Sequence, residues 1–192
     1  MSEFWSKVFN FLVSTFIKQT LQNNSTPGTI ESSITTSMEL PTFSGNVGPP
    51  EGMIESRDIN DCHPQLAGRF RDVAMEFKLL TGLELYVTCT YRSKDKQNEL
   101  YQIGRRGLPD EKKVTNLDGY TKRSRHNVYP AEAIDVSVDS DPGTGKHLSW
   151  NPKLYYLLGD LCTTHGLIWG GTFSSFGPDG DYPHIELPAE LA

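Results

Sequence analysis

The element that decides the fold is the stretch RSRHNVYPAEAIDVSV, residues 123–138. Apolar residues alternate from Ile134 to Val138, which is typical of a half-buried strand with one face in the core. Asp135 then lies on the opposite face, and His126 precedes it by nine positions in a basic, turn-rich segment. The stretch therefore predicts a strand and leaves two interpretations of the His/Asp pair. It is either a metal site or a loop histidine followed by an ordinary surface aspartate.

The segments on either side of this stretch predict an α+β domain. Apolar spacing and capping residues predict helices within residues 63–82, 94–103 and 149–167, and alternation predicts strands within 83–91, 167–169 and 184–187. The first helix is expected to bury Leu66, Phe70, Val73, Ala74, Phe77 and Leu80, and the first strand to place Leu83, Leu85, Val87, Cys89 and Tyr91 on one face. Because the helices and strands do not alternate as βαβ units, we expect a small, mainly antiparallel sheet flanked by helices.

Composition limits the class of protein. A chain of 192 residues with 36% hydrophobic and 22% charged residues indicates a soluble globular protein. The net charge of −6 argues against a nucleic-acid binder, since phosphate contacts require an excess of Lys and Arg. Cys62, Cys89 and Cys162 are far apart and odd in number, so they are predicted to be buried free thiols.

The first 51 residues differ in composition from the rest. Residues 1–22 predict an amphipathic helix that docks on a partner protein or on its own domain; contact with a membrane interface and a cryptic export signal are the alternatives. Its apolar run is too short to span a bilayer, and Glu3 and the lack of a cleavage site do not fit a signal peptide. Residues 23–51 are rich in Ser, Thr, Asn, Gly and Pro and predict a linker. Residues 52–192 are left as the folded domain.

A third candidate metal ligand lies in the stretch GDYPHIEL, residues 180–187. Apolar alternation places His184 and Glu186 together on the face of the strand that points away from the core. Asp181 precedes His184 by three positions, and Pro183 favours a bend that would bring both side chains to one side.

Two imidazoles and one carboxylate are the ligands of a catalytic zinc site that keeps its fourth position for water. His126, Asp135 and His184 supply this set. Asp181 or Glu186 supplies a base that takes a proton from the water during attack on a carbonyl, and spacing alone does not choose between the two.

Three stretches in this order resemble the zinc peptidases of bacterial cell walls. They are YRSKDKQNELYQIGR, SRHNVYPAEAIDV and the pair GLIWGG and GDYPHIEL, and the resemblance covers about residues 52–188. The family comprises D-alanyl-D-alanine carboxypeptidases and L-alanyl-D-glutamate endopeptidases of the Hedgehog/DD-peptidase fold, including many bacteriophage endolysins. The long spacing between His126 and Asp135 resembles the phage-type branch. Thr172 and Phe173 stand where relatives often place an acid.

The resemblance implies roles for individual residues. It implies that His126, Asp135 and His184 bind one zinc ion, that Asp181 is the general base, and that Arg92 polarises the scissile carbonyl and stabilises the oxyanion. The residues implied to lie near the substrate are Gln97 and Ser124. Glu186 remains the alternative base.

The activity expected from this resemblance is hydrolysis of peptidoglycan stem peptides. The L-alanyl-D-glutamate bond is the preferred target and the D-Ala–D-Ala end is second. We expect a phage lysis or virion-associated enzyme that acts on the cell wall from the virion or from the host cytoplasm or periplasm. Residues 1–50 would then contact a virion or other assembly protein. The alternative is a non-catalytic binding or structural module of a phage particle, in which zinc only holds the loops.

Overall fold

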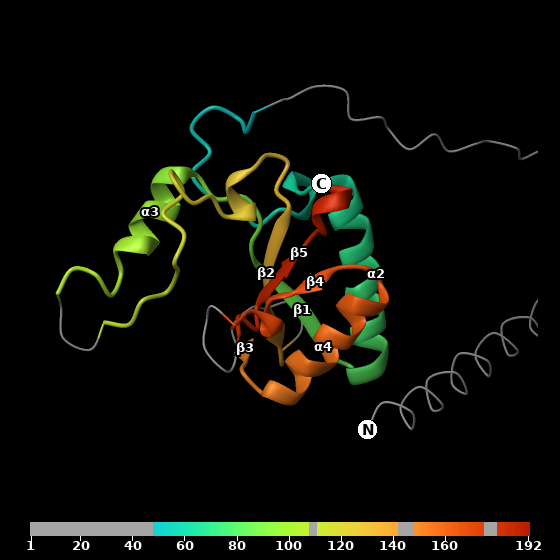
Figure 1. The fold of residues 1–192 in the computed structure, drawn as a ribbon. Helices are drawn as coiled ribbons and strands as arrows, with labels where there is room; N and C mark the ends of the chain where they lie inside the picture. The colour runs from blue at the N-terminus through green and yellow to red at the C-terminus, as the bar shows by residue number, and fades with distance from the viewer. Residues whose placement is uncertain (1–47, 108–110, 142–147, 175–179) are drawn as a thin grey trace, which may run out of the picture. The chain divides into compact units, whose positions relative to one another are not determined.

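The computed structural model describes residues 48–107, 111–141, 148–174 and 180–192. Two helices and a five-stranded sheet form the body of this part (Figure 1). The predicted helix over 1–22, and all of the predicted linker over 23–51 except its last four residues, lie outside the described residues. Within the described ranges, no helix is both long and apolar enough to cross a membrane.

The sheet is antiparallel at every pairing that joins its strands. The strands are β1 (Glu84–Cys89), β2 (Ala133–Asp139), β3 (Leu148–Ser149), β4 (Ile168–Trp169) and β5 (His184–Glu186). Their order is β1-β2-β5-β4, and β3 also pairs with β2. The predicted α+β class with a small antiparallel sheet is confirmed, and β3 is an addition that the sequence did not predict.

Helices α2 (Pro64–Thr81) and α4 (Pro152–Thr164) pack against each other and cover one face of the sheet (Figure 1). Both begin with proline after a capping side chain, His63 and Asn151, as helix starts commonly do. Gly82 ends α2 with a φ of 73°. A third helix, α3 (Lys94–Gln102), follows the Ser93 cap. The three helices predicted within residues 63–82, 94–103 and 149–167 are therefore confirmed to within a few residues.

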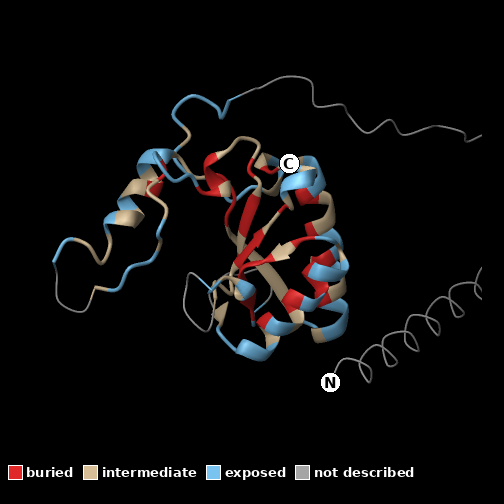
Figure 2. Cartoon of the chain, viewed as in Figure 1, coloured by how far each residue is buried: buried red, intermediate tan, exposed pale blue. Residues whose placement is uncertain are grey.

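The core lies between the two helices and the sheet (Figure 2). Ile134, Val136 and Val138 of β2 are fully buried there. The opposite side of β2 is also largely covered, because Ser137 and Asp139 are buried as well. The prediction of a half-buried strand therefore understates the burial of β2, which pairs with β1 on one side and β5 on the other.

Two sequence-based core predictions are wrong in detail. Leu80 is 44% exposed, because it lies in the last turn of α2 beyond the buried stripe. In β1, the register shifts between Val87 and Cys89, so the alternation breaks there. A bulge adds a residue to one strand and changes which face the following side chain takes. Cys89 is buried outside the main core cluster, whereas Leu85 and Val87 pack against it.

The three cysteines are confirmed as buried free thiols. Burial raises the pKa of Cys162 to about 12, so this thiol stays protonated at neutral pH.

Gly159 and Gly68 make a matched test of helix packing. A Cβ on Gly159 of α4 would lie 2.3 Å from the Trp169 ring, whereas one on Gly68 of α2 would meet nothing within 4 Å. We expect Gly159→Ala to destabilise the protein by about 1–3 kcal/mol through overpacking. Gly68→Ala should stabilise it by about 0.5–1 kcal/mol, because alanine favours helix. Urea unfolding measures the change in stability for both variants. Equal changes in the two variants would contradict the close packing of Gly159 against Trp169.

Candidate metal centre

His126, Asp135 and His184 meet on the face of the sheet opposite the helices. Asp135 of β2 and His184 of β5 are directly paired across the two strands, so their side chains share a face. His126 comes from the short 3₁₀ turn Arg125–Asn127, which the hydroxyl of Ser124 caps by accepting a hydrogen bond from the His126 amide. The strand register and this capped turn therefore bring together the three ligands predicted from the sequence.

Three atoms of these side chains form a nearly equilateral triangle. Asp135 Oδ1 lies 3.1 Å from His126 Nε2 and 3.1 Å from His184 Nδ1. The two ring nitrogens are 3.3 Å apart. A tetrahedral zinc ion with bonds of 2.0–2.1 Å holds its ligand atoms about 3.3–3.4 Å from one another. The spacing of the triangle fits that geometry.

The outer hydrogen bonds fix the tautomer of each imidazole. His126 Nδ1 lies 2.6 Å from the Thr90 carbonyl oxygen, which only accepts, so Nδ1 carries the hydrogen. His184 Nε2 lies 3.1 Å from a carboxylate oxygen of Glu186 and donates to it. In the neutral rings, the nitrogens that face the triangle therefore present lone pairs.

Three electron-pair donors that face one another at this distance require a cation or a proton between them. Both outer acceptors are of the kind that orient metal-binding histidines, a backbone carbonyl and a carboxylate. His126 is 2% and His184 8% exposed, so water supplies little compensation. The donor set of two imidazoles and one carboxylate, with its outer partners in place, fits zinc.

Cys89 offers an alternative third ligand. Its sulfur and ligand atoms of His126 and Asp135 all lie within 4.8 Å of one another. Only the thiolate binds metal, and burial raises the pKa of Cys89 to about 12. The Cys89 thiol also lies 3.8 Å from the Tyr91 carbonyl oxygen, to which it donates. His184, whose Nδ1 completes the tighter triangle, is therefore the better third ligand.

The protonation of the metal-free triangle follows from its charges. Burial alone raises the pKa of Asp135, but the charges and hydrogen bonds of His126 and His184 outweigh burial and hold that pKa well below its usual range. Burial lowers the pKa of His184, whereas hydrogen bonds to Asp135 and Glu186 raise it further, to about 10. At neutral pH, His184 of the metal-free protein therefore holds a proton in the place of a cation.

Zinc binding is expected to release this proton. The metal must displace it from His184, so the affinity of the metal-free protein for zinc should rise about tenfold per pH unit through the neutral range and level off as pH passes the His184 pKa of about 10. Competition with a chromogenic chelator at several pH values measures the slope. An affinity that does not change with pH would contradict the shared proton.

Asp181 approaches the triangle through the predicted bend. Tyr182 and Pro183 form a turn, and the His184 amide donates to the Asp181 carbonyl at 3.2 Å. Burial raises the pKa of Asp181, and the next largest influences on it are the charges of His184 and Asp135. Its carboxylate makes no hydrogen bond or ion pair with a described residue. Asp181 thus has a half-buried carboxylate, not held by a partner in this part of the chain, beside the ligands.

The glycines around Trp169 hold the Asp181 turn in place. The Asp181 amide donates to the Gly170 carbonyl at 2.8 Å, and the Trp169 indole donates to the Tyr182 carbonyl at 2.8 Å. A Cβ on Gly170 would lie 2.6 Å from the Asp181 carbonyl oxygen and 2.8 Å from the His184 Cβ. Only glycine allows the two backbone segments to approach this closely.

Arg92 reaches the centre from the end of β1. Its Nη2 donates to Asp135 Oδ2 at 3.3 Å, so Asp135 uses one oxygen for the triangle and the other for Arg92. Its Nη1 donates to Gln97 Oε1 at 3.2 Å, and its Nε lies 3.5 Å from Glu55 Oε1. The Arg92 side chain is 13% exposed, so these acceptors fix the plane of its guanidinium beside the centre. Glu55 carried no signal in the sequence.

The remaining predicted site residues have the following positions. Gln97 is buried, and its amide nitrogen donates to the Thr115 hydroxyl and the Leu117 carbonyl. Ser124 is buried beneath the turn that it caps. Glu186 bonds to the His184 nitrogen that faces away from the triangle, and its other oxygen lies 3.9 Å from Arg125 Nε. Contact of Gln97 and Ser124 with substrate stays a prediction.

Comparison with solved structures finds peptidases at low sequence identity. The L-Ala D-Glu endopeptidase ChiX of Serratia marcescens is 22% identical with a TM-score of 0.48, over 69% of this chain and 84% of its own. The D,D-pentapeptidase VanY of a VanB-type resistance cassette, in complex with Zn(II), is 16% identical with a TM-score of 0.49, over 72% of this chain and 81% of its own. The LD-carboxypeptidase LdcB is 17% identical with a TM-score of 0.46, over 66% of this chain and 58% of its own.

No family model matches the sequence, and no curated protein matches it. Peptidases of the kind that the sequence motifs resemble are thus among the solved proteins to which this chain is similar. At these identities, the metal and the chemistry have to be inferred from the side chains of this chain.

Proposed function

We propose that this chain is a zinc-dependent peptidase that hydrolyses the stem peptides of peptidoglycan. The observation that carries the proposal is the triangle of His126 Nε2, Asp135 Oδ1 and His184 Nδ1, with sides of 3.1–3.3 Å, flanked by Asp181 and Arg92. The triangle alone would suit any zinc protein. The adjacent acid, which pairs with no described residue, and the oriented cation make it suited to hydrolysis of a carbonyl compound.

Each side chain has a distinct part in the proposed reaction. A zinc ion in the triangle supplies a water activated at neutral pH and a Lewis acid for the carbonyl. Asp181 takes the proton of the attacking water and passes it to the leaving amine. The guanidinium of Arg92 donates to the oxygen that becomes negative in the tetrahedral state. Glu186 holds His184 in the tautomer that binds metal, which favours Asp181 over Glu186 as the base.

The preferred bond is L-alanyl-D-glutamate, and the D-Ala–D-Ala end is second. The similar structures include an L-Ala D-Glu endopeptidase and a D,D-pentapeptidase, so enzymes for both kinds of bond are represented among them. The motif spacing between His126 and Asp135 resembles the phage-type branch, which supports a role in phage lysis or in a virion. Residues 1–50 are then proposed to attach the enzyme to an assembly protein or to a membrane interface.

Digestion of purified sacculi tests this proposal. The zinc-loaded protein is expected to release stem-peptide fragments, and mass spectrometry of the new ends distinguishes an endopeptidase, which exposes the amine of D-glutamate, from a carboxypeptidase, which frees D-alanine. His126→Ala removes one ligand and should abolish release. Release by His126→Ala at the rate of the unaltered protein would refute the proposed site.

The rival proposal is a non-catalytic module in which zinc only holds the loops together. A structural zinc site is typically closed by four protein ligands, and it requires neither an unpaired acid nor an arginine beside it. The presence of Asp181 and Arg92 at the triangle therefore favours catalysis. Zinc content alone does not separate the two proposals, because both expect one ion per chain.

A further inference from the structure

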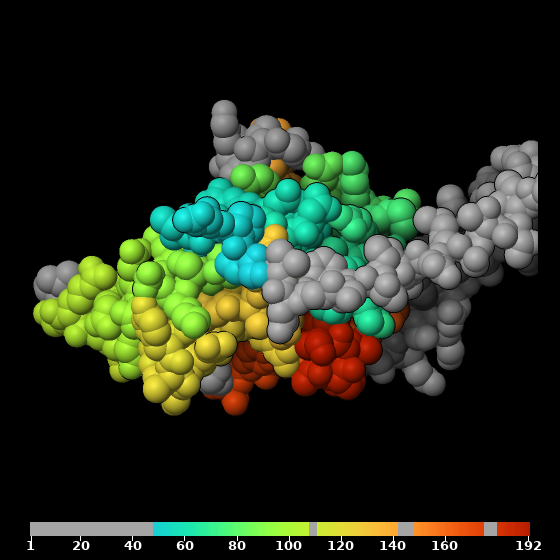
Figure 3. All heavy atoms as spheres, turned by 90° about the horizontal axis from the view of Figure 1, so that it is seen from above, coloured from blue at the N-terminus to red at the C-terminus, as the bar shows by residue number. Residues whose placement is uncertain are grey.

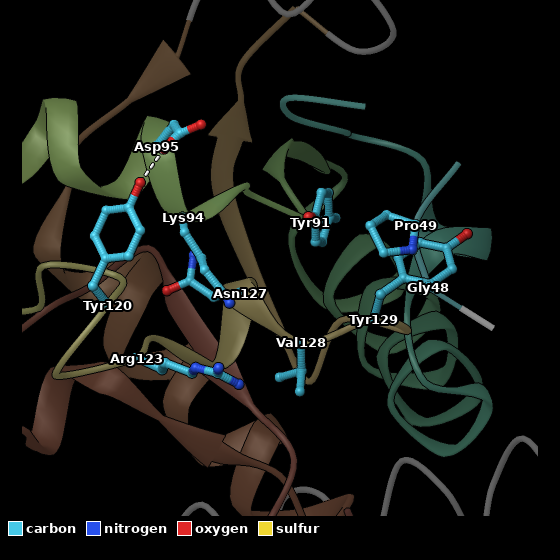
Figure 4. Close-up of a pocket in the computed structure, with 10 residues that line it drawn as sticks. All are labelled: Gly48, Pro49, Tyr91, Lys94, Asp95, Tyr120, Arg123, Asn127, Val128 and Tyr129. Carbon is cyan, nitrogen blue, oxygen red and sulfur yellow. Dashed lines mark hydrogen bonds between the residues drawn. The ribbon is translucent and has the colours of Figure 1, made fainter. Parts of the chain in front are cut away.

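A pocket of about 660 Å³ is lined by Tyr91 and Asn127, which are the chain neighbours of Arg92 and His126 (Figure 4). It lies where residues 48–49, the start of α3 and the segment 120–129 come together. Figure 3 shows these parts of the chain on one face, in cyan, green and yellow. Its volume is within the range of about 300–1,000 Å³ that is common for ligand sites. Neither the proposed zinc ligands nor Asp181 line this pocket.

The rim of the pocket carries positive charge that is not paired by any described residue. Lys94 and Arg123 are exposed on its wall, and neither makes an ion pair with a residue in the described part of the chain. The acid on the wall is Asp95, whose carboxylate already accepts a hydrogen bond from the Tyr120 hydroxyl. The pocket also opens at the N-terminus of α3, where the first backbone amides have no partner within the helix and the dipole is positive. These groups favour an anionic ligand.

The other walls are aromatic and held in place. Tyr91 is 7% exposed and packs edge-on against Tyr129, with ring centroids 5.6 Å apart. The Tyr129 hydroxyl donates to Asp61 at 2.9 Å. Figure 4 shows these two rings opposite Tyr120, Lys94 and Arg123, across the opening of the pocket. A ligand that carries both small apolar groups and a negative charge would match the two sides.

One layer of backbone joins the pocket to the metal centre. The pocket residues Tyr91 and Asn127 directly precede and follow Arg92 and His126 in the chain. The Arg92 amide donates to the His126 carbonyl at 2.8 Å, and the Asn127 side chain donates to the Arg92 carbonyl at 2.8 Å. Because an extended peptide covers about 3.3–3.6 Å per residue, a few residues suffice to reach from the scissile bond to the pocket.

We propose that this pocket is a substrate subsite that binds a free carboxylate of the stem peptide away from the scissile bond. The inference rests on the proposed function and adds to it a preference for acidic over amidated peptides. Stem peptides contain alanine methyl groups and free carboxylates, which match the aromatic wall and the pair Lys94 and Arg123. Both cations are exposed, so each contact should be modest in strength and should weaken as salt increases.

Steady-state kinetics with two soluble peptides tests the subsite. One is a stem pentapeptide with free carboxylates. The other is the same peptide in which every free carboxylate has been converted to an amide. The zinc-loaded protein is expected to show a KM about five- to tenfold lower for the acidic peptide. In the double variant Lys94→Ala/Arg123→Ala, that preference should disappear, with the effect on KM rather than kcat. The control is Arg106→Ala/Lys153→Ala, which removes the same charge from exposed positions outside the pocket.

The outcomes separate the subsite from the proposed function. Turnover of neither peptide by the unaltered protein would overturn the proposed function itself. Two results would overturn the subsite alone. One is that the Lys94/Arg123 variant turns over the peptides with the same preference for the acidic one as the unaltered protein. The other is that the control variant loses this preference as fully as the Lys94/Arg123 variant does. Calorimetric titration of both peptides into zinc-loaded Asp181→Asn gives the same comparison for binding without hydrolysis. A double variant that bound the acidic peptide as tightly as its parent would also overturn the subsite.

Discussion

Replacing Asp181 by asparagine is expected to lower kcat for stem-peptide hydrolysis by about 10²- to 10⁴-fold, the usual contribution of a general base. The amide has nearly the shape of the carboxylate but does not accept the proton of the attacking water. Asp181 lies outside the ligand triangle, so the variant should still bind one zinc ion per chain. Kinetics at saturating zinc, together with metal analysis of the same sample, measure both quantities. Asp72→Asn, an exposed acid on α2, is the control.

Glu186→Gln gives the contrast that identifies the base. Its carboxylate accepts from His184 Nε2, on the far side of the ring from the triangle, so its loss should weaken zinc binding by about 10- to 100-fold. With zinc in excess, kcat should stay within a few-fold of the parent. If Glu186→Gln lost kcat as severely as Asp181→Asn under those conditions, the assignment of the base would be wrong. Asp181→Asn with more than a tenth of the parent activity would equally contradict it.

Replacing Arg92 by alanine is expected to lower kcat by about 10²- to 10³-fold, as removal of one oxyanion donor does in other hydrolases. The guanidinium is held between Asp135, Gln97 and Glu55, so its donors are oriented before substrate arrives. Arg92→Lys should recover little, because an ammonium group has neither the planar fork nor the reach to these three acceptors. Kinetics at saturating zinc measure both variants.

Two controls show whether the loss of kcat in Arg92→Ala reflects lost stabilisation of the transition state. Arg106→Ala removes an exposed arginine beyond α3 and should leave kcat within about twofold of the parent, as expected for a surface change. Thermal unfolding shows whether loss of the contact with Asp135 alters the fold. If Arg92→Ala raised KM and left kcat intact, Arg92 would bind the ground state and would not stabilise the oxyanion.

Two of the three proposed zinc ligands, Asp135 and His184, could be placed from the sequence because they lie on regular strands. The period of two in β2 and β5 places Asp135 and His184 on one face, and antiparallel pairing makes them direct neighbours. The same periodicity gave the α+β class and the buried face of β2. The helix starts at Pro64 and Pro152 could be predicted from local capping chemistry, because it depends on only a few neighbouring residues.

The rest of the site depends on contacts between distant segments, which no local pattern encodes. The bulge in β1 moves Cys89 off the core face, although its alternation with Val87 is intact in the sequence. Glu55 meets Arg92 across an isolated bridge, and the backbone carbonyl of Thr90, which sets the tautomer of His126, has no sequence signature at all. The pocket beside the centre likewise combines residues from three separate segments.

X-ray absorption spectroscopy at the zinc edge tests the metal centre most directly. Two imidazole nitrogens and one carboxylate oxygen should give a first shell of nitrogen and oxygen alone, at about 2.0–2.1 Å, with a fourth light atom from solvent. The imidazole scattering should fall by half in His184→Ala. A sulfur scatterer at about 2.3 Å would instead place zinc on Cys89 and contradict the ligand set of His126, Asp135 and His184.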